Sequence, residues 1–399
     1  MKKLLPLLFV LIPLLFLSNI LKSQETETLT FEEYKKQQDA KYKQYTESVT
    51  LELEKYMLEE QRGIEKLRQE IEDYWGSNDF KLSNKKDWVE YSEDKKTRTD
   101  VDFENGSAKV EVLLDPEEAN DPDKVKEKLK TAIEGLIVSK GKTKDYETES
   151  EKPKELLETP VLDRQLQTVN GDKVNDKNTG EYANEILIAD NIKTEELKGS
   201  DGKTRIKVYV SLPLAPDHIK TRSTRFQDFI NKYSNQFKLP PELIYAIIHT
   251  ESYFNPKAKS HVPAFGLMQI VPKYAGRDAY QYLYDQDKML SSNYLYKPNQ
   301  NIELGTAYLR LLMSREFKKV KDEKCKILCC IAAYNTGAGN VSKAFTGNTN
   351  IYKAVKKINK LNYKQLFNIL HKDLPYQETR DYIVKVTDRM NKYKSWKGE

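Results

Sequence analysis

Glu251 is the residue whose position in this 399-residue sequence best suits acid–base chemistry. It follows Ile244, Ile247 and Ile248 by seven, four and three residues, so on a helix its carboxyl lies beside an apolar stripe. The predicted helix spans about 241–252, which puts Glu251 near the negative end of the helix dipole. Desolvation and the dipole both raise a carboxyl pKa, as a general acid working near neutrality requires. Periodicity alone, however, favours a simpler interpretation, in which the side chain reaches solvent at a fraying helix end.

The composition excludes several other chemistries. The chain has four His and three Cys but neither HExxH nor a paired CxxC pattern, so a zinc site is not expected. Nucleotide chemistry has no support, because GxGxxG after a strand and GxxxxGK(S/T) are both missing. Cys325, Cys329 and Cys330 crowd one apolar helix, where buried thiols are expected rather than a disulfide. His249 and His261 are interpreted as cleft-wall or surface residues. We therefore expect no metal, no cofactor and no nucleic-acid partner.

The first 23 residues have the pattern of a secretory signal. Lys2 and Lys3 precede an apolar run over 4–17, which is shorter than a bilayer span. No Cys follows this run, so a lipid-modified N-terminal Cys is excluded. Cleavage near Ser23 and retention as a membrane anchor are both compatible with the sequence. The chain is expected to be exported to the periplasm or cell envelope.

Charge divides the remaining chain into two parts. Residues 24–220 contain 33 Lys and Arg against 46 Asp and Glu, whereas residues 221–399 contain 30 against 15. Opposite charge suggests two units with separate tasks, and 213–216 is predicted to link them. We predict a signal or anchor over 1–23, an acidic accessory domain over 24–216 and a basic catalytic domain over 217–399. A further hypothesis is that the negative net charge of the first domain binds the basic domain directly.

The residue patterns predict an α+β fold with an N-terminal α+β accessory domain and a mainly α second domain. In the first, we expect two helices over 30–75 and 121–138, strands over 99–103, 108–114 and 204–212, and loops over 140–181. The strand at 204–212 alternates and is predicted to be half-buried. In the second, we expect helices at about 226–237, 241–252, 302–317, 326–335, 353–358, 363–371 and 379–392.

Four ordered motifs connect the second domain to a known enzyme family. They read ESYFNPKAKS at 251–260, AFGLMQIVP at 264–272, AAYNTGAG at 332–339 and ETRDY at 378–382. Together they closely resemble the lytic transglycosylases of the goose-type lysozyme superfamily. Segments 101–106, 212–218, 275–278 and 301–309 resemble a membrane-bound, lipid-anchored member of that family. The resemblance implies a lysozyme-like catalytic domain.

The resemblance also implies a set of substrate-binding residues around Glu251. Ser260 and Gln269 would form hydrogen bonds around the substrate acetamido group and Glu251, and Met268 and Asn335 would line neighbouring subsites. Tyr334 and Tyr382 would orient the carboxyl or contact the reacting sugar. Each has a structural alternative: a turn hydroxyl for Ser260, a gap-filling thioether for Met268, a helix C-cap for Asn335, and packing for Tyr334 and Tyr382.

Finally, the resemblance implies cleavage of peptidoglycan glycan strands without water. Glu251 would protonate the oxygen of the β-1,4 bond between N-acetylmuramic acid and N-acetylglucosamine. It would then accept a proton from the sugar's own 6-hydroxyl to leave a 1,6-anhydro ring. Because the motifs contain one acidic residue suited to this task, a substrate-assisted mechanism is favoured over a pair of carboxylates. Two alternatives stay open: a hydrolytic muramidase, which needs a second acidic residue facing the sugar, and a non-catalytic peptidoglycan-binding scaffold.

Overall fold

The structure of the protein is a computed structural model that describes residues 30–143, 154–261 and 263–396. The predicted signal or anchor over 1–23 lies outside the described residues. By compactness the chain forms two units, 1–51 and 52–399. Among the described residues, no helix has the length and hydropathy of a membrane span.

The described part of the first unit is the start of a long helix, α1 (Phe31–Trp75), which continues into the second unit. Thr30 caps this helix: its hydroxyl accepts from the Glu33 amide, and the Glu33 carboxylate accepts from the Thr30 amide. This reciprocal arrangement is a capping box. The helix passes through Gly63 without a break, and it ends where Gly76 adopts a positive φ of 74°. The helix predicted over 30–75 is therefore confirmed.

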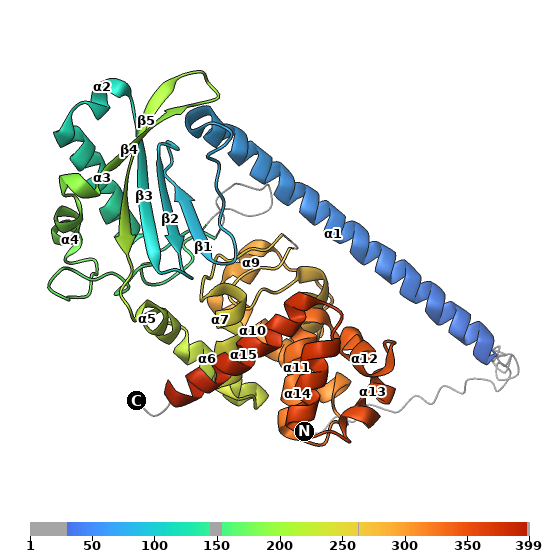
Figure 1. Cartoon of the computed structure of the whole chain (residues 1–399). Coiled ribbons are helices and arrows are strands. Elements are labelled where there is room, and N and C mark those ends of the chain that lie inside the picture. The colour runs from blue at the N-terminus through green and yellow to red at the C-terminus, as the bar shows by residue number, and fades with distance from the viewer. Residues whose placement is uncertain (1–29, 144–153, 262, 397–399) are drawn as a thin grey trace, which may run out of the picture. The chain divides into compact units, whose positions relative to one another are not determined.

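A five-stranded antiparallel sheet follows, with strand order β1-β2-β3-β5-β4 (Figure 1). Its strands are β1 (Asp87–Tyr91), β2 (Thr97–Asp102), β3 (Ser107–Leu114), β4 (Lys193–Lys198) and β5 (Thr204–Pro213). The strands predicted over 99–103 and 108–114 are confirmed as β2 and β3, and a turn joins them where Asp102 pairs with Ser107 and Gly106 has a φ of 70°. The sequence predicted neither β1 nor β4.

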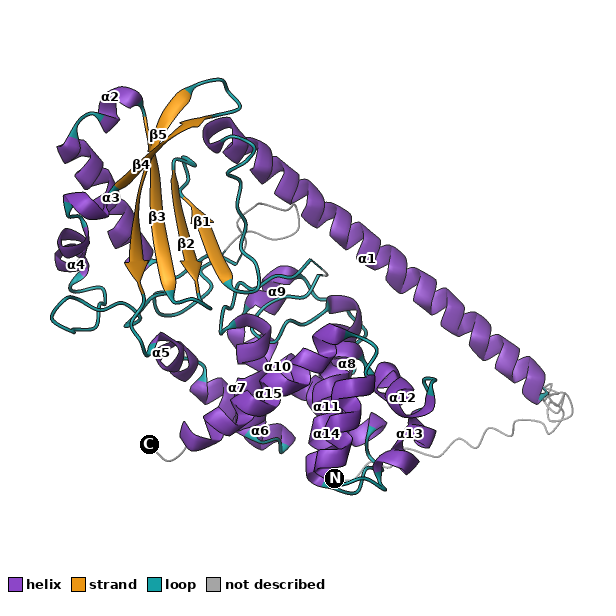
Figure 2. Cartoon of the chain, in the orientation of Figure 1, coloured by secondary structure: helices purple, strands orange, loops and turns teal. Residues whose placement is uncertain are grey.

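Helices cover one face of this sheet, as Figures 1 and 2 show. They are α2 (Pro116–Ala119) and α3 (Pro122–Val138), and α4 (Thr179–Ile186) packs against α3. The helix predicted over 121–138 is confirmed as α3, whose Val125, Leu129, Ile133 and Ile137 are all buried. The predicted α+β character of this region is confirmed as well.

Part of the opposite face of the sheet is buried too, which corrects the half-buried strand predicted at 204–212 over its first residues. Arg205 and Lys207 are buried, whereas Tyr209 is half-buried and Ser211 is exposed. Lys207 is only 5% exposed, and its ammonium group pairs with Asp79 at 2.7 Å. Arg98 also pairs with Asp79, at 3.0 Å, and its guanidinium lies over the Trp75 ring. Alternation alone assigns such charged side chains to solvent, but paired charges with a long aliphatic stem can be buried.

The second region is helical, as predicted (Figure 2). Its helices are α5 (His218–Thr224), α6 (Gln227–Phe237), α7 (Pro241–Ser252), α8 (Arg277–Tyr284), α9 (Ser292–Tyr296), α10 (Pro298–Leu311), α11 (Glu323–Thr336), α12 (Ala338–Thr346), α13 (Ile351–Ile358), α14 (Tyr363–Asp373) and α15 (Gln377–Ser395). Short π-helical turns at Pro272–Gly276 and Leu312–Glu316 precede α8 and extend α10. The sequence missed α5, α8, α9 and α12, which are short.

Of the predictions about the Cys and His residues, the one for His249 is wrong and the others are confirmed. The three Cys are free and buried, as expected. His249 is not a cleft-wall or surface residue: it is 5% exposed, and its Nδ1 lies 2.9 Å from the Tyr393 hydroxyl. Burial lowers the pKa of His249 to about 2, so this ring is neutral. His261 is exposed, in agreement with the prediction.

The predicted linker over 213–216 is packed rather than loose. Leu214 and Ala215 are buried, and their amides donate to the carbonyls of Gly106 and Gln165. Residues 52–399 form one compact unit, so the domain boundary near 217 stays a proposal.

Arg222 of α5 ties the helical region to the sheet region. Its guanidinium is 1% exposed and donates to the Tyr253 carbonyl at 2.8 Å, the Gln165 amide oxygen at 2.6 Å and the Phe103 carbonyl at 3.1 Å. The Phe103 ring also lies 4.2 Å from this guanidinium. One buried cation thus satisfies acceptors from three separate segments.

Replacing Arg222 by Leu should destabilise the protein by about 3 kcal/mol, because three buried acceptors lose their donor. Urea unfolding followed by circular dichroism measures this change. Lys220→Leu is the matched control, since Lys220 is an exposed cation on the same helix. Equal unfolding midpoints for the two variants would contradict the structural role assigned to Arg222.

Candidate active site

Glu251 lies in the last turn of α7 with its carboxyl buried. It is 6% exposed, and Ile244, Ile247 and Ile248 on the same helix are fully buried. The apolar stripe predicted from the spacing is therefore present, and the exposed alternative for Glu251 is wrong. Burial raises the pKa of the Glu251 carboxyl above its ordinary value, and the negative charge of Glu378 raises it further.

The backbone reverses sharply just after this carboxyl. Tyr253 and Phe254 both adopt positive φ angles, 51° and 62°. Such angles are costly for residues with large side chains and persist only where neighbours enforce them. Ser252 supplies part of that restraint, because its hydroxyl lies 3.0 Å from the Ile248 carbonyl and 2.8 Å from the Leu267 carbonyl. The end of α7 is thereby fixed to the loop that contains the second motif.

A lysine from the sheet region faces the catalytic candidate. The Lys85 ammonium group lies 3.7 Å from a Glu251 carboxylate oxygen, and it opposes the rise in the carboxyl pKa. No motif in the sequence pointed to Lys85, which lies 166 positions before Glu251. Glu378 was also not singled out, although it belongs to the last matched motif. Spatial proximity is the only signal that identifies either residue.

Two tyrosines complete the surroundings of the carboxyl. The Tyr382 hydroxyl is buried without a hydrogen bond of standard geometry to any described residue, yet it is close enough to Glu251 to lower that pKa. The Tyr334 hydroxyl donates to the Met268 carbonyl at 2.8 Å. Burial, and then the charge of Glu251, raise the pKa of both tyrosines well above the ordinary value. Both phenols therefore stay protonated at neutral pH.

The loop over 258–270 carries three of the predicted residues. Gln269 has a φ of 48°, and its amide nitrogen donates to the carbonyls of Ala258 and Gly266, each at 3.0 Å. The amide oxygen of Gln269 is buried and has no partner among the described residues. The Gln269 side-chain nitrogen thus stabilises the loop that contains it, and the Gln269 amide oxygen is available to accept a hydrogen bond from a ligand.

Met268 is fully buried, so its thioether does not line an open surface. Its amide donates to the Asn301 side chain at 2.7 Å. Its sulfur packs so closely on Gly305 that a Cβ there would lie 2.4 Å from it. The gap-filling alternative describes this side chain better than a subsite does, while its carbonyl positions Tyr334.

The other two predicted residues lie in different surroundings. Ser260 lines a groove of about 810 Å³, whose walls include Lys85 and Phe265. Asn335 near the end of α11 accepts a hydrogen bond from the Thr379 hydroxyl of α15 at 2.7 Å. The structure therefore brings Tyr334 and Tyr382 to Glu251, places Ser260 beside Lys85, and uses Asn335 to join two helices.

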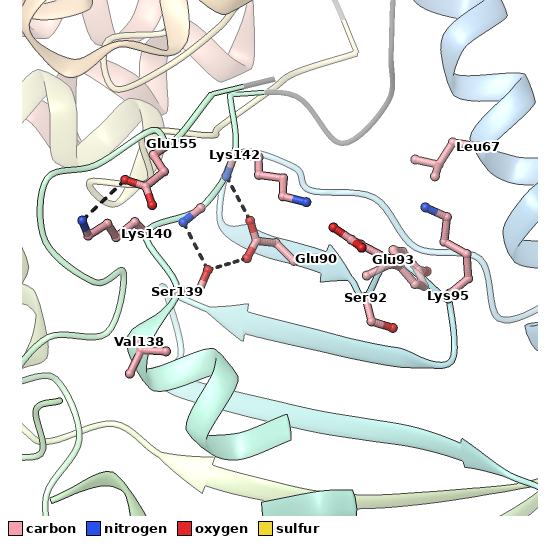
Figure 3. Close-up of a pocket in the computed structure, with 12 residues that line it drawn as sticks. Leu67, Glu90, Ser92, Glu93, Lys95, Val138, Ser139, Lys140, Lys142 and Glu155 are labelled. Carbon is pink, nitrogen blue, oxygen red and sulfur yellow. Dashed lines mark hydrogen bonds and ion pairs between the residues drawn. The ribbon is translucent and has the colours of Figure 1, made fainter. Parts of the chain in front are cut away.

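Figure 3 shows a separate hollow of about 330 Å³ beside β1, which none of the predicted site residues lines. Within it, the Glu90 carboxylate accepts from the Ser139 hydroxyl at 2.9 Å and the Lys142 amide at 3.2 Å. A third contact, with the Lys257 ammonium group at 3.5 Å, lies outside the hollow's lining. Of the three carboxylates that line the hollow, Glu90 is thus paired within the protein, and Glu155 pairs with Lys140 at 3.4 Å. Across the described residues, no three His, Cys, Asp or Glu side chains are grouped as metal ligands.

Comparison with family models agrees with this geometry in both regions. The model for the transglycosylase SLT domain matches residues 228–357. The model for the N-terminal domain of membrane-bound lytic murein transglycosylase C matches residues 46–225.

Curated relatives cover most of the chain. The membrane-bound lytic murein transglycosylase C of Actinobacillus pleuropneumoniae serotype 5b (strain L20) is 30% identical over 323 residues, which are 81% of this chain and 84% of the relative. That of Histophilus somni (strain 2336) is 30% identical over 81% of this chain and 85% of its own length. Among solved structures, the soluble lytic transglycosylase SLT70 of Escherichia coli matches at 25% identity with a TM-score of 0.35. That match covers 46% of this chain and 26% of SLT70.

These matches define the class of the protein as a lytic transglycosylase with an SLT domain. The chain belongs to the membrane-bound lytic murein transglycosylase C family. The lysozyme-like, mainly α second domain expected from the motifs is thereby confirmed.

Replacing Glu251 by Gln should stabilise the folded protein at neutral pH. The folded-state pKa of Glu251 is raised above the ordinary 4.5, so the unfolded chain loses this proton first as the pH rises. Stability therefore falls between the unfolded and folded pKa values and stays lower above them, a penalty that Gln does not incur. Urea unfolding at several pH values should show the two proteins converging in acid and separating near neutrality.

Glu127→Gln is the control for this stability difference, since Glu127 is an exposed carboxylate on α3 that is not among the influences on the Glu251 pKa. It removes the same carboxylate chemistry without relieving a buried charge. A variant Glu251→Gln that is less stable than wild type at pH 7 would contradict the raised pKa.

Proposed function

We propose that this enzyme cleaves the β-1,4 bond between N-acetylmuramic acid and N-acetylglucosamine in peptidoglycan without water. The observation that carries the proposal is the buried Glu251 carboxyl, whose raised pKa provides the proton that a leaving sugar oxygen needs. The residue roles below are part of this proposal.

In the first step, Glu251 donates its proton to the glycosidic oxygen as the bond to the anomeric carbon breaks. The positive charge that develops at that carbon is stabilised by the oxygen of the muramoyl 2-acetamido group. The Tyr382 hydroxyl, which the buried site keeps protonated, donates a hydrogen bond to the sugar or orients the carboxyl. Tyr334, whose hydroxyl donates to the Met268 carbonyl, contacts the reacting sugar or orients the carboxyl as an acceptor. No second catalytic carboxylate is required.

In the second step, the Glu251 carboxylate takes the proton of the 6-hydroxyl on the same muramoyl residue. The 6-oxygen bonds to the anomeric carbon, which closes a 1,6-anhydro ring and restores the protonated acid. Gln269 supports the acetamido group through its unpartnered amide oxygen, which accepts the acetamido N–H. Ser260 contacts the glycan from the adjoining groove, and Asn335 acts through α15 rather than on the sugar.

Hydrolysis is the second candidate because of one observation. Glu378 is a second carboxylate whose charge acts on Glu251. An exposed carboxylate near the sugar could activate water, as in enzymes that use two acids. The buried setting of Glu251 favours the intramolecular 6-hydroxyl, since a closed site excludes water.

We also propose how the chain is organised and where it acts. Residues 217–399 are the catalytic domain and residues 24–216 the accessory domain, as the separate family-model matches support. Curated relatives are named membrane-bound, which supports export to the cell envelope with residues 1–23 as a signal or anchor.

Digestion of murein sacculi tests the reaction directly. The wild-type chain should release muropeptides with 1,6-anhydro ends, and Glu251→Gln should lower the rate by at least about a thousandfold, because the proton donor is lost. Mass spectrometry of the released muropeptides measures both. Reducing N-acetylmuramic ends would instead establish hydrolysis, and loss of those ends in Glu378→Gln would assign the water-activating base.

A further inference from the structure

Lys85 reaches the catalytic carboxyl from outside the region that carries the transglycosylase motifs. It precedes β1, its side chain is 39% exposed, and its ammonium group lies 3.7 Å from the Glu251 carboxylate. The part of the chain matched by the SLT model begins only at residue 228. The cation nearest to the general acid is therefore supplied by the other part of the molecule.

The turn that presents Lys85 is well ordered by its own hydrogen bonds. The Asn84 side-chain oxygen accepts from the amides of Lys86 and Asp87 at 2.8 and 2.9 Å. The Asn84 amide donates to the Asp87 carbonyl at 3.1 Å. An Asx turn of this kind limits the directions in which the Lys85 side chain can leave the backbone.

The chain just after Glu251 holds this turn from both sides. The side-chain amide of Asn255, four residues after Glu251, is fully buried and lies 3.2 Å from the Asn84 carbonyl and 3.3 Å from the Asp87 carbonyl. These two carbonyls flank Lys85 in the sequence. The segment 251–255 thus fixes the backbone of Glu251 and the backbone of Lys85 relative to each other.

Opposing influences act on the Glu251 carboxyl from every element packed around it. Burial within α7 and the charge of Glu378 on α15 favour the neutral acid, whereas Lys85 and the Tyr382 hydroxyl favour the carboxylate. Tyr334 of α11 is neutral and adds no charge. Lys85 is thus the described cation whose charge acts most strongly on this carboxyl.

We propose that Lys85 is a positioning residue of the reaction, which holds Glu251 in place and favours the ionised form that must accept the 6-hydroxyl proton. This proposal rests on the function proposed above, in which one carboxyl serves first as acid and then as base. A carboxyl governed by burial alone would give up its proton reluctantly in the first step. The Lys85 ammonium group offsets part of that burial.

The pH dependence of kcat/KM tests this role with the full chain on sacculi. Activity requires protonated Glu251 in the free enzyme, so it declines as the pH rises through that pKa. Lys85→Gln should move this decline to higher pH, because the carboxylate loses its cation. It should also lower kcat several-fold at the pH optimum while leaving KM nearly unchanged. Lys85→Arg should restore both properties.

Two further variants complete the comparison. Lys86→Gln makes the same change one residue away, where the cation pairs with Glu104 instead, and should leave the decline where it is. Glu378→Gln should move the decline to lower pH, opposite to Lys85→Gln. A uniform loss of rate in Lys85→Gln without a shift would overturn the proposal, and so would a rise in KM alone, which would assign Lys85 to substrate anions.

A measurement without substrate separates this proposal from the proposed function. Carbon-13 NMR titration of Glu-labelled protein, with Glu251→Gln to assign the signal, follows the ionisation of Glu251 directly. Lys85→Gln should titrate at higher pH than wild type even if sacculus digestion yields no anhydro ends. Identical titration in the two proteins would overturn the role of Lys85 while leaving the catalytic role of Glu251 intact.

Discussion

The burial of one carboxyl at the end of α7 is the constraint on which the rest of the site depends. A carboxylate removed from water is unfavourable unless a cation or hydrogen-bond donors compensate for the lost hydration. Here the compensation is partial. The Lys85 ammonium group lies 3.7 Å from the Glu251 carboxylate, and the nearby Tyr382 hydroxyl also favours the ionised form of Glu251. Complete compensation would keep Glu251 ionised, whereas the absence of any compensation would keep it protonated. A carboxyl that must both give and take a proton needs an intermediate balance, and three segments distant in sequence provide it.

Buried polar contacts around the carboxyl explain how this balance is kept in one geometry. Asn301 on α10 uses both ends of its side chain: its oxygen accepts from the Met268 amide at 2.7 Å, and its nitrogen donates to the carbonyls of Phe265 and Leu295 at 2.8 and 2.7 Å. A fully satisfied buried amide of this kind specifies one loop conformation. The position of Tyr334 depends on that loop conformation, because its hydroxyl donates a hydrogen bond to the Met268 carbonyl. The rigid loop costs backbone freedom, but it spares the site from reorganising during the reaction.

Local patterns predicted most helices and the strands β2 and β3, because apolar spacing within one element decides which face is buried. For Glu251, periodicity alone favoured a solvent-exposed side chain, and the structure shows a buried one. Local patterns failed where a contact between distant segments decides the outcome. The strand β4 reads KTEELK, a charged, exposed sequence suited to a sheet edge but without apolar alternation. Lys207 looked solvent-exposed because its partner Asp79 lies 128 positions away. Lys85 belongs to no motif, and only the folded chain brings it to Glu251.

The opposite net charges of the two parts of the chain correspond to specific ion pairs between them in the fold. Lys257 and Lys259, from the basic part, pair with Glu90 at 3.5 Å and Glu60 at 3.1 Å in the acidic part. At the catalytic carboxyl the polarity is reversed, since the acidic part contributes the cation and the basic part the anion. The opposite net charges of the two parts would attract each other even without a cation in the acidic part facing an anion in the basic part. General attraction therefore does not explain why Lys85 lies beside Glu251. A contact that opposes the overall charge pattern, at the buried carboxyl proposed as the general acid, is better explained by the needs of the proposed reaction than by assembly.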